Sequence, residues 1–277
     1  MTERPLRPYV YADTPEGPGL HGSLTEQLAV MLDGFTHRRL DKAGVRMGDR
    51  CLELGAGNGS IAHLLAGWVG DTGEVVATDL DPSQIAPARG LTIIAHDITT
   101  DPLEGSFDLI HARMLLGHLP DRNTIMHRLA DTLRPGGALV VEQFDPDWDR
   151  CVIEAPIPLA EAQDLFAAYH HALMKVLREA GTDPTWGRRC PQVMRDAGLV
   201  RIEAEFWSRT WHGGQAGCQL ALASATRLRD KLVAAGMAPA QLDQFAGLLA
   251  DQRLMIRGIT AVSVIGWRPV EVPEVPT

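Results

Sequence analysis

The sequence lacks the features that mark several protein classes. It has only 4 cysteines in 277 residues, at positions 51, 151, 190 and 218, and they form no C-x-x-C pair, so neither a zinc knuckle nor a redox dithiol is predicted. No apolar run approaches the roughly 20 residues of a membrane helix, and the first residues lack the apolar centre of a signal peptide. The scattered His and Asp residues show no spacing typical of metal ligands. We expect a cytoplasmic protein with free thiols, no membrane partner and no metal.

The sequence also has no basic run, and its formal net charge is -9. Nucleic acids are bound mainly through Lys and Arg at the phosphates, so no nucleic-acid partner is predicted. The remaining composition, 45% hydrophobic and 22% charged, is that of a globular protein. We predict three parts, namely an N-terminal arm and helix that act as a lid (1–44), an α/β core (45–150), and a last part (151–277) with a helical cap at about 211–257. A monomer and a homodimer are both left open.

Strand-like and helical patterns alternate through the first half of the chain, which predicts a parallel sheet covered on both faces. The second half changes to long helices, with two late strands that are expected to pair. Strands are predicted at 50–54, 74–79, 91–95, 107–112, 138–144, 199–210 and 259–267. Helices are predicted from a Ser23 cap to about Leu40, and at 59–68, 82–89, 121–133, 157–180 and 190–197, with two more in 215–254. The segment LRPGG (133–137) is interpreted as a structural helix end that turns into the next strand.

A glycine-rich segment, LELGAGNGS (52–60), follows the first predicted strand and precedes a helix. Such loops bring the backbone close to a ligand, and Gly55, Gly57 and Ser60 nearly fit the dinucleotide pattern. Glu53, however, lies at the mouth of the loop, where a carboxylate repels a pyrophosphate and favours a cationic ligand. Asp79 ends the second strand, where a carboxylate can accept hydrogen bonds from both ribose hydroxyls, and Asp97 follows the third. The three acids and the loop predict a site for an adenosine that carries a positive charge.

Five segments in this order, LELGAGNG, VVATDLD, AHDI, FDLIHARMLLGHLPD and LRPGGALVVEQF, resemble the class I S-adenosylmethionine (SAM)-dependent methyltransferases over about residues 45–145. The resemblance implies a Rossmann-like fold with a seven-stranded, mostly parallel sheet in the order 3-2-1-4-5-7-6, and the cap between the last two strands. It implies SAM as cofactor and S-adenosylhomocysteine (SAH) as product. The implied cofactor-binding residues are Glu53, Gly55, Ala56, Gly57, Asp79, Leu80, Asp97, Ile98, His111, Ala112 and Arg113. For Glu53, Asp79 and Asp97, capping or turn roles are the alternatives, and Asp81 is interpreted as a helix cap.

Residues for the methyl acceptor are expected at the carboxyl edge of the sheet. His118 can remove a proton near neutral pH, although a packing role is the alternative. Glu142 and Asp145 end the fifth strand on opposite faces, and we favour Glu142 as the catalytic carboxylate. Substrate contacts are also predicted for Tyr9, Tyr11 and His21 in the arm and for Tyr169 in the helix 157–180, each with a packing role as the alternative.

The leading functional hypothesis is methyl transfer to the oxygen, nitrogen or carbon of a small molecule, in specialised metabolism. A peptide or other macromolecular acceptor is the second. A nicotinamide-dependent oxidoreductase and a non-catalytic SAM-binding protein complete the hypotheses, and the acceptor's identity lies beyond the sequence.

Overall fold

A computed structural model describes residues 24–270, and they form two compact units. Of the described residues, the sheet unit comprises 32–143, 185–206 and 261–270. The helical unit comprises 24–31, 144–184 and 207–260. No helix within residues 24–270 is long and apolar enough to span a membrane.

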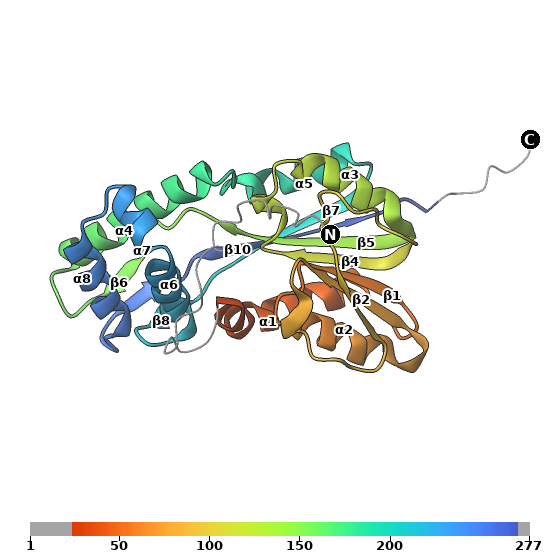
Figure 1. Ribbon diagram of the computed structural model, residues 1–277, viewed down its shortest axis with the longest axis horizontal. Coiled ribbons are helices and arrows are strands. Elements are labelled where there is room, and N and C mark those ends of the chain that lie inside the picture. The colour runs from red at the N-terminus through yellow and green to blue at the C-terminus, as the bar shows by residue number, and fades with distance from the viewer. Residues whose placement is uncertain (1–23, 271–277) are drawn as a thin grey trace, which may run out of the picture. The chain divides into compact units, whose positions relative to one another are not determined.

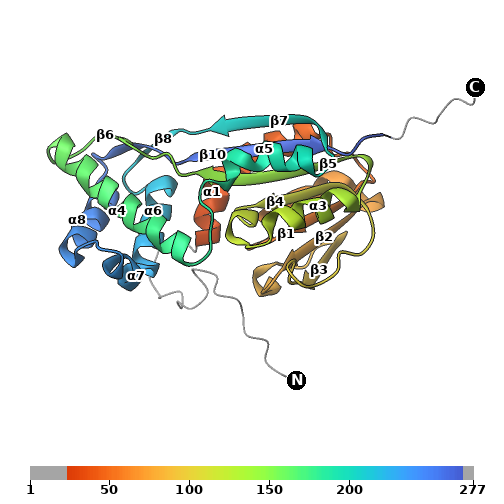
Figure 2. The same ribbon diagram turned by 90° about the horizontal axis from the view of Figure 1, so that it is seen from above.

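The sheet unit is built on seven strands in the order β3-β2-β1-β4-β5-β10-β7, with β7 at one edge (Figures 1 and 2). The strands are β1 (Arg50–Leu54), β2 (Glu74–Asp79), β3 (Leu91–Ala95), β4 (Phe107–Arg113), β5 (Leu133–Asp145), β7 (Val200–Trp207) and β10 (Thr260–Trp267). The first five pair in parallel. Reciprocal backbone hydrogen bonds join Arg268 to Gly136 and Gly137, so the end of β10 meets the start of β5 and β10 runs antiparallel. This arrangement confirms the predicted order 3-2-1-4-5-7-6.

Helices cover both faces of the sheet (Figure 1). One face packs on α1 (Leu24–Ala43) and α2 (Ser60–Val69), the other on α3 (Arg122–Thr132) and α5 (Trp186–Asp196). The side chains of each strand alternate between the two apolar cores, with Cys51 and Leu109 on the α1/α2 face and Leu52 and Ile110 on the other. The near-continuous apolar strands of the sequence are explained by this double burial.

The helical unit contains the segments between β5 and α5 and between β7 and β10. Its helices α4 (Leu159–Glu179), α6 (Ala216–Arg227), α7 (Arg229–Ala234) and α8 (Pro239–Ala250) pack on one another, and β6 (Val152–Glu154), β8 (Thr210–His212) and β9 (Met255–Arg257) form a separate sheet in the order β6-β9-β8. The predicted insertion of helices between the last two strands of the large sheet is confirmed. The three short strands were not predicted, because three residues are too few to show an alternation.

Several predicted boundaries were wrong. The helix expected at 82–89 is only a 3-10 turn, Pro82–Gln84, since Pro87 lacks an amide donor and disfavours a helical conformation of the residue before it. The strand expected at 199–210 ends earlier, because β7 covers Val200–Trp207 and Thr210 already belongs to β8 in the other sheet. Helix α5 starts at Trp186 rather than 190, and β5 already starts at Leu133, within the segment interpreted as a helix end. The expected cap Ser23 lies outside the described residues.

Candidate active site

The loop from β1 to α2 depends on three glycines with left-handed backbone conformations. Gly55, Gly57 and Gly59 have φ angles of 65°, 56° and 80°, which side chains other than glycine adopt at a cost. The amide of Ala56 donates to the carbonyl of Thr78 on β2 at 2.9 Å. The loop is thus fixed at the carboxyl ends of β1 and β2, where open α/β sheets bind ligands.

Asp79 holds this loop through its side chain. Its Oδ2 accepts a hydrogen bond from the amide of Gly57 at 2.9 Å, and its Oδ1 accepts one from the amide of Asp81 at 3.1 Å. The next residue, Leu80, is 55% exposed. Asp81 accepts from the amide of Ser83, as its predicted cap role requires. The carboxylate of Asp79 therefore lies beside the loop at the carboxyl end of β2, where the resemblance implies the ribose.

Gly59→Ala is expected to lower the free energy of unfolding by about 2 kcal/mol, because the new Cβ requires a left-handed backbone and lies 2.8 Å from Cγ2 of Ile85. Gly67→Ala is the matched control. Gly67 lies within α2, and a Cβ added at this position would meet no atom within 4 Å, so this change is expected to stabilise the helix by up to about 1 kcal/mol. Urea unfolding of both variants measures the difference, and equal effects would contradict the role given to Gly59.

Beside the loop, a buried ion pair joins β1 to β4. Glu53 and His111 are paired in register and are 3% and 0% exposed, and the His111 Nδ1 atom lies 2.6 Å from Oε2 of Glu53. Burial opposes the charged imidazole, but the carboxylates of Glu53 and Glu142 outweigh it and raise the pKa of His111 to about 9. His111 is therefore an imidazolium at neutral pH, and the charge of Glu53 is compensated on one side.

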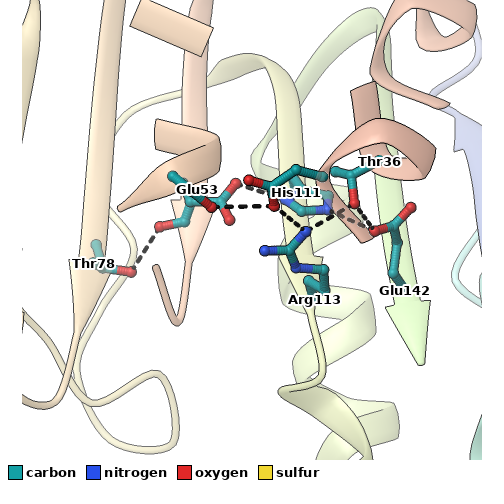
Figure 3. Close-up of polar contacts among 8 residues, drawn as sticks. Thr36, Glu53, Thr78, His111, Arg113 and Glu142 are labelled. Carbon is teal, nitrogen blue, oxygen red and sulfur yellow. Dashed lines mark hydrogen bonds and ion pairs between the residues drawn. The ribbon is translucent and has the colours of Figure 1, made fainter. Parts of the chain in front are cut away.

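The same imidazolium lies beside Glu142 of β5 (Figure 3). Its Nε2 is 3.6 Å from Oε2 of Glu142, an ion-pair distance rather than a hydrogen bond. The Oγ1 of Thr36 donates to the same carboxylate oxygen at 2.5 Å. Burial opposes ionisation of Glu142, yet His111, Arg113 and Thr36 together lower its pKa. These contacts favour the ionised form of Glu142, which is a hydrogen-bond acceptor.

Helix α1 contributes two polar residues to this site that the sequence analysis missed. Arg113 donates from Nη1 to Asp33 at 2.9 Å and to Thr36 at 3.0 Å, and the hydroxyl of Ser60 donates to Asp33 at 3.2 Å. Thr36 is fully buried. The sequence signal that could have identified Thr36 is its position next to Phe35, on the otherwise apolar side of the helix. A polar residue at such a position is explained better by a functional role than by packing.

Comparison with known proteins places this site in a family. A family model described as a methyltransferase domain matches residues 24–187, which is more than half of the chain. The chain belongs to the class I SAM-dependent methyltransferases. The chain is 34% identical to the methyltransferase str2 of Strobilurus tenacellus over 50% of this chain and 49% of that protein. It is 26% identical to the ubiquinone/menaquinone biosynthesis C-methyltransferase UbiE of Cupriavidus necator over 66% of this chain and 80% of that protein. For str2 and for two other curated relatives, an uncharacterised 37.1 kDa protein of Streptomyces fradiae and UbiE of Laribacter hongkongensis, the match spans only about half of the relative's length.

Solved structures share the fold. The phosphoethanolamine N-methyltransferase 2 of Haemonchus contortus, in complex with SAH, has a TM-score of 0.52 at 14% identity, covering 95% of this chain and 56% of that one. The [4+2]-cyclase SpnF has a TM-score of 0.51 at 15% identity, covering 86% of this chain and 81% of that one. At such identities the likeness shows the fold alone. The cofactor follows from the family instead, and it is SAM.

Other residues that the methyltransferase resemblance implied have different surroundings. Asp97 accepts two hydrogen bonds at Oδ1 from the amide and hydroxyl of Thr99, the arrangement of its alternative as a turn residue. Ile98 and Ala112 are buried in the apolar core that packs on α3 and α5. The side chain of Ala112 therefore faces away from those of His111 and Arg113.

Two further predicted groups, His118 after β4 and Asp145 at the end of β5, have defined surroundings. His118 ends the short 3-10 helix Leu116–His118, where burial and the nearby Arg122 lower its pKa to about 4. It is a neutral imidazole at pH 7 and a weak base. Asp145 is 7% exposed, and its Oδ1 accepts from the amide of Asp147.

Of the four residues predicted to contact the substrate from the arm and from α4, the structure describes Tyr169. Tyr9, Tyr11 and His21 lie outside the described residues. Tyr169 is 1% exposed in the helical unit, with its ring stacked on Phe245 at 4.3 Å between centroids. Its surroundings are those of the packing alternative. Among residues 24–270, no group of three or more His, Cys, Asp or Glu is arranged to hold a metal ion.

Proposed function

We propose that this methyltransferase transfers the methyl group of SAM to a small-molecule acceptor. The observation that carries the proposal is the glycine loop 55–59 at the carboxyl ends of β1, β2 and β4, which is fixed by Asp79 and flanked by Glu53 and His111. SAM supplies an electrophilic methyl on a cationic sulfur, so the protein has mainly to bind and align the acceptor.

The helical unit offers a pocket of small-molecule size. Its volume is about 340 Å³, within the range of known ligand sites, and Trp148 and Phe166 supply aromatic walls. His170 of α4 also lines it, and its Nε2 is buried without a hydrogen-bond partner among the described residues. Burial lowers the pKa of His170 despite a hydrogen bond with the Pro146 backbone. Because a carbonyl can only accept, the Nδ1–H is the donor there, and Nε2 is left to accept from a ligand.

We infer an acceptor with an aromatic or apolar body and a hydroxyl or amine that donates to His170. Neither candidate base is a strong one, since His118 has a pKa of about 4 and the pKa of Glu142 is lowered. Such a site suits an acceptor that is already nucleophilic at neutral pH, such as an amine or an electron-rich aromatic carbon. The printed name of UbiE, a ubiquinone/menaquinone biosynthesis C-methyltransferase, supports a small acceptor, and specialised metabolism remains the setting we propose.

His170→Ala is expected to raise the acceptor KM at least about tenfold through loss of the buried hydrogen bond, with SAH affinity unchanged. The assay measures SAH release from SAM with a panel of phenols, quinols and amines, and, in parallel, with peptides. Lys175→Ala, on an exposed position of α4 outside the pocket, is the control and is expected to leave the KM unchanged. Turnover with peptides alone would favour the macromolecular alternative, and no turnover despite SAH binding would favour a non-catalytic SAM-binding protein.

A further inference from the structure

Polar side chains gather at one end of the sheet face that packs on α1 and α2. Along β1, β4 and β5, apolar Cys51, Leu109 and Val140 lie on this face. Two residues further along each strand, the same face carries Glu53, His111 and Glu142. Three ionisable groups thus adjoin one another at the carboxyl end of an otherwise apolar layer.

The cluster carries an unbalanced negative charge. The imidazolium of His111 lies between two carboxylates, 2.6 Å from that of Glu53 and 3.6 Å from that of Glu142. The neighbouring pair Arg113 and Asp33 is neutral by itself. One negative charge is therefore left in a region where His111 and Glu142 are at most 1% exposed, and buried charge is costly unless it is paired.

Two atoms of the cluster, His111 Nε2 and Glu142 Oε1, are buried without a hydrogen-bond partner among residues 24–270. Oε2 of Glu142 accepts from Thr36 and faces His111, whereas Oε1 is buried and has no hydrogen-bond partner among residues 24–270 (Figure 3). Thr36 cannot turn away easily, because its hydroxyl also accepts from Arg113 at 3.0 Å. Buried polar atoms are paired in native proteins with few exceptions, so the free oxygen points to a ligand that donates a hydrogen bond and carries positive charge.

We propose that Glu142, oriented by Thr36 and His111, binds a cationic group of SAM and makes the site prefer SAM over its product SAH. This inference rests on the cofactor of the proposed function. SAM has two cationic groups, its α-ammonium and its sulfonium, against one carboxylate. Transfer of the methyl group removes the sulfonium charge, so SAH is neutral overall, and its net attraction to the cluster is weaker than that of SAM. Thr36 is a positioning residue in this account, since it acts through Glu142.

Calorimetric titration with SAM and with SAH tests the proposal in wild type, Glu142→Gln, Thr36→Val and Thr36→Ser. Glu142→Gln is expected to weaken SAM binding about tenfold, the effect of one charge pair of modest strength. Thr36→Val keeps the shape of the side chain and removes the hydroxyl. It is expected to weaken SAM binding by less than Glu142→Gln does. Thr36→Ser keeps the hydroxyl and is expected to bind like wild type.

The two ligands distinguish the two cationic groups. A loss confined to SAM indicates the sulfonium, because SAH lacks that charge. An equal loss for both ligands indicates the α-ammonium, which they share, and would withdraw the preference for SAM while keeping the cation site. If the variants instead disturbed the packing, Thr36→Ser would also bind SAM more weakly than wild type. The loss of affinity of each variant would then follow the fall in its melting temperature.

Unchanged affinities for both ligands in Glu142→Gln and Thr36→Val would overturn the proposal. If Glu142→Gln fails to fold, the contrast between Thr36→Val and Thr36→Ser decides by itself, and equal binding by these two variants would overturn it as well. The titration requires no acceptor, so an error about small-molecule methylation leaves its result unchanged. A wild type that binds neither ligand would overturn both this proposal and the cofactor crevice.

Discussion

Between pH 6.5 and 9, the protein is expected to lose about 3 kcal/mol of its free energy of unfolding through the titration of His111. The pKa of this residue is about 9 in the folded protein, against about 6.5 in an unfolded chain. The folded state therefore holds the proton more tightly, and the stabilisation is fully present below pH 6.5 and disappears as the pH rises through 9. Urea unfolding at a series of pH values measures it.

His111→Gln removes this titration and should be less stable than wild type at pH 6.5, with a difference that shrinks toward pH 9. Thiols and other groups also titrate in this range, so the difference between wild type and variant is the informative quantity. His127→Gln changes an exposed residue of α3 and is the matched control, expected to follow the wild-type curve. A difference between wild type and His111→Gln that stays constant with pH would contradict a charged His111.

Asp79→Ala is expected to weaken SAH binding roughly 100-fold. Two losses combine in this variant, the carboxylate expected to accept from the ribose hydroxyls and the hydrogen bond that fixes the amide of Gly57. Hydrogen bonds to a charged group contribute about 1.5–3 kcal/mol each, and 1.4 kcal/mol corresponds to tenfold in affinity. Calorimetry with SAH measures the change.

Asp71→Ala is the matched control for Asp79→Ala. Its carboxylate is 67% exposed and pairs only at the surface, with Arg89. Its removal is expected to leave SAH affinity within about twofold of wild type, since such surface pairs contribute little. Undiminished binding by Asp79→Ala would remove Asp79 from the cofactor site.

Much of the fold could be predicted because the central strands of the sheet, β1, β2, β4 and β5, are buried and mostly apolar on both faces. Strands β1, β2 and β3 have the predicted bounds, and the antiparallel β10 was placed to within one residue. The errors arise where a local signal is weak or misleading. Pro82 and Asp81 are good helix-start residues, yet Pro87 prevents the helix from continuing. Strands β6, β8 and β9 depend on pairing between distant segments rather than on their own sequence.

The site was predictable where backbone chemistry fixes a residue type, as at Gly55, Gly57 and Asp79. Charges that interact across strands were not predictable in the same way. Glu53 was interpreted by its charge alone, whereas the register of β1 and β4 pairs it with His111. Glu142 was favoured as a base, but the neighbouring imidazolium lowers its pKa and favours a binding role. The contribution of Thr36 required the packing of α1 on the sheet.

The fold leaves the reaction open, since SpnF, a [4+2]-cyclase, has a similar fold. The assignment therefore depends on the residues around the crevice. The most direct measurement is a crystal structure of this protein with SAH. Our account predicts the ribose hydroxyls on the carboxylate of Asp79 and the homocysteine beside the loop 55–59 and the Glu53, His111 and Glu142 cluster. SAH bound elsewhere, or a ribose with no contact to Asp79, would contradict it.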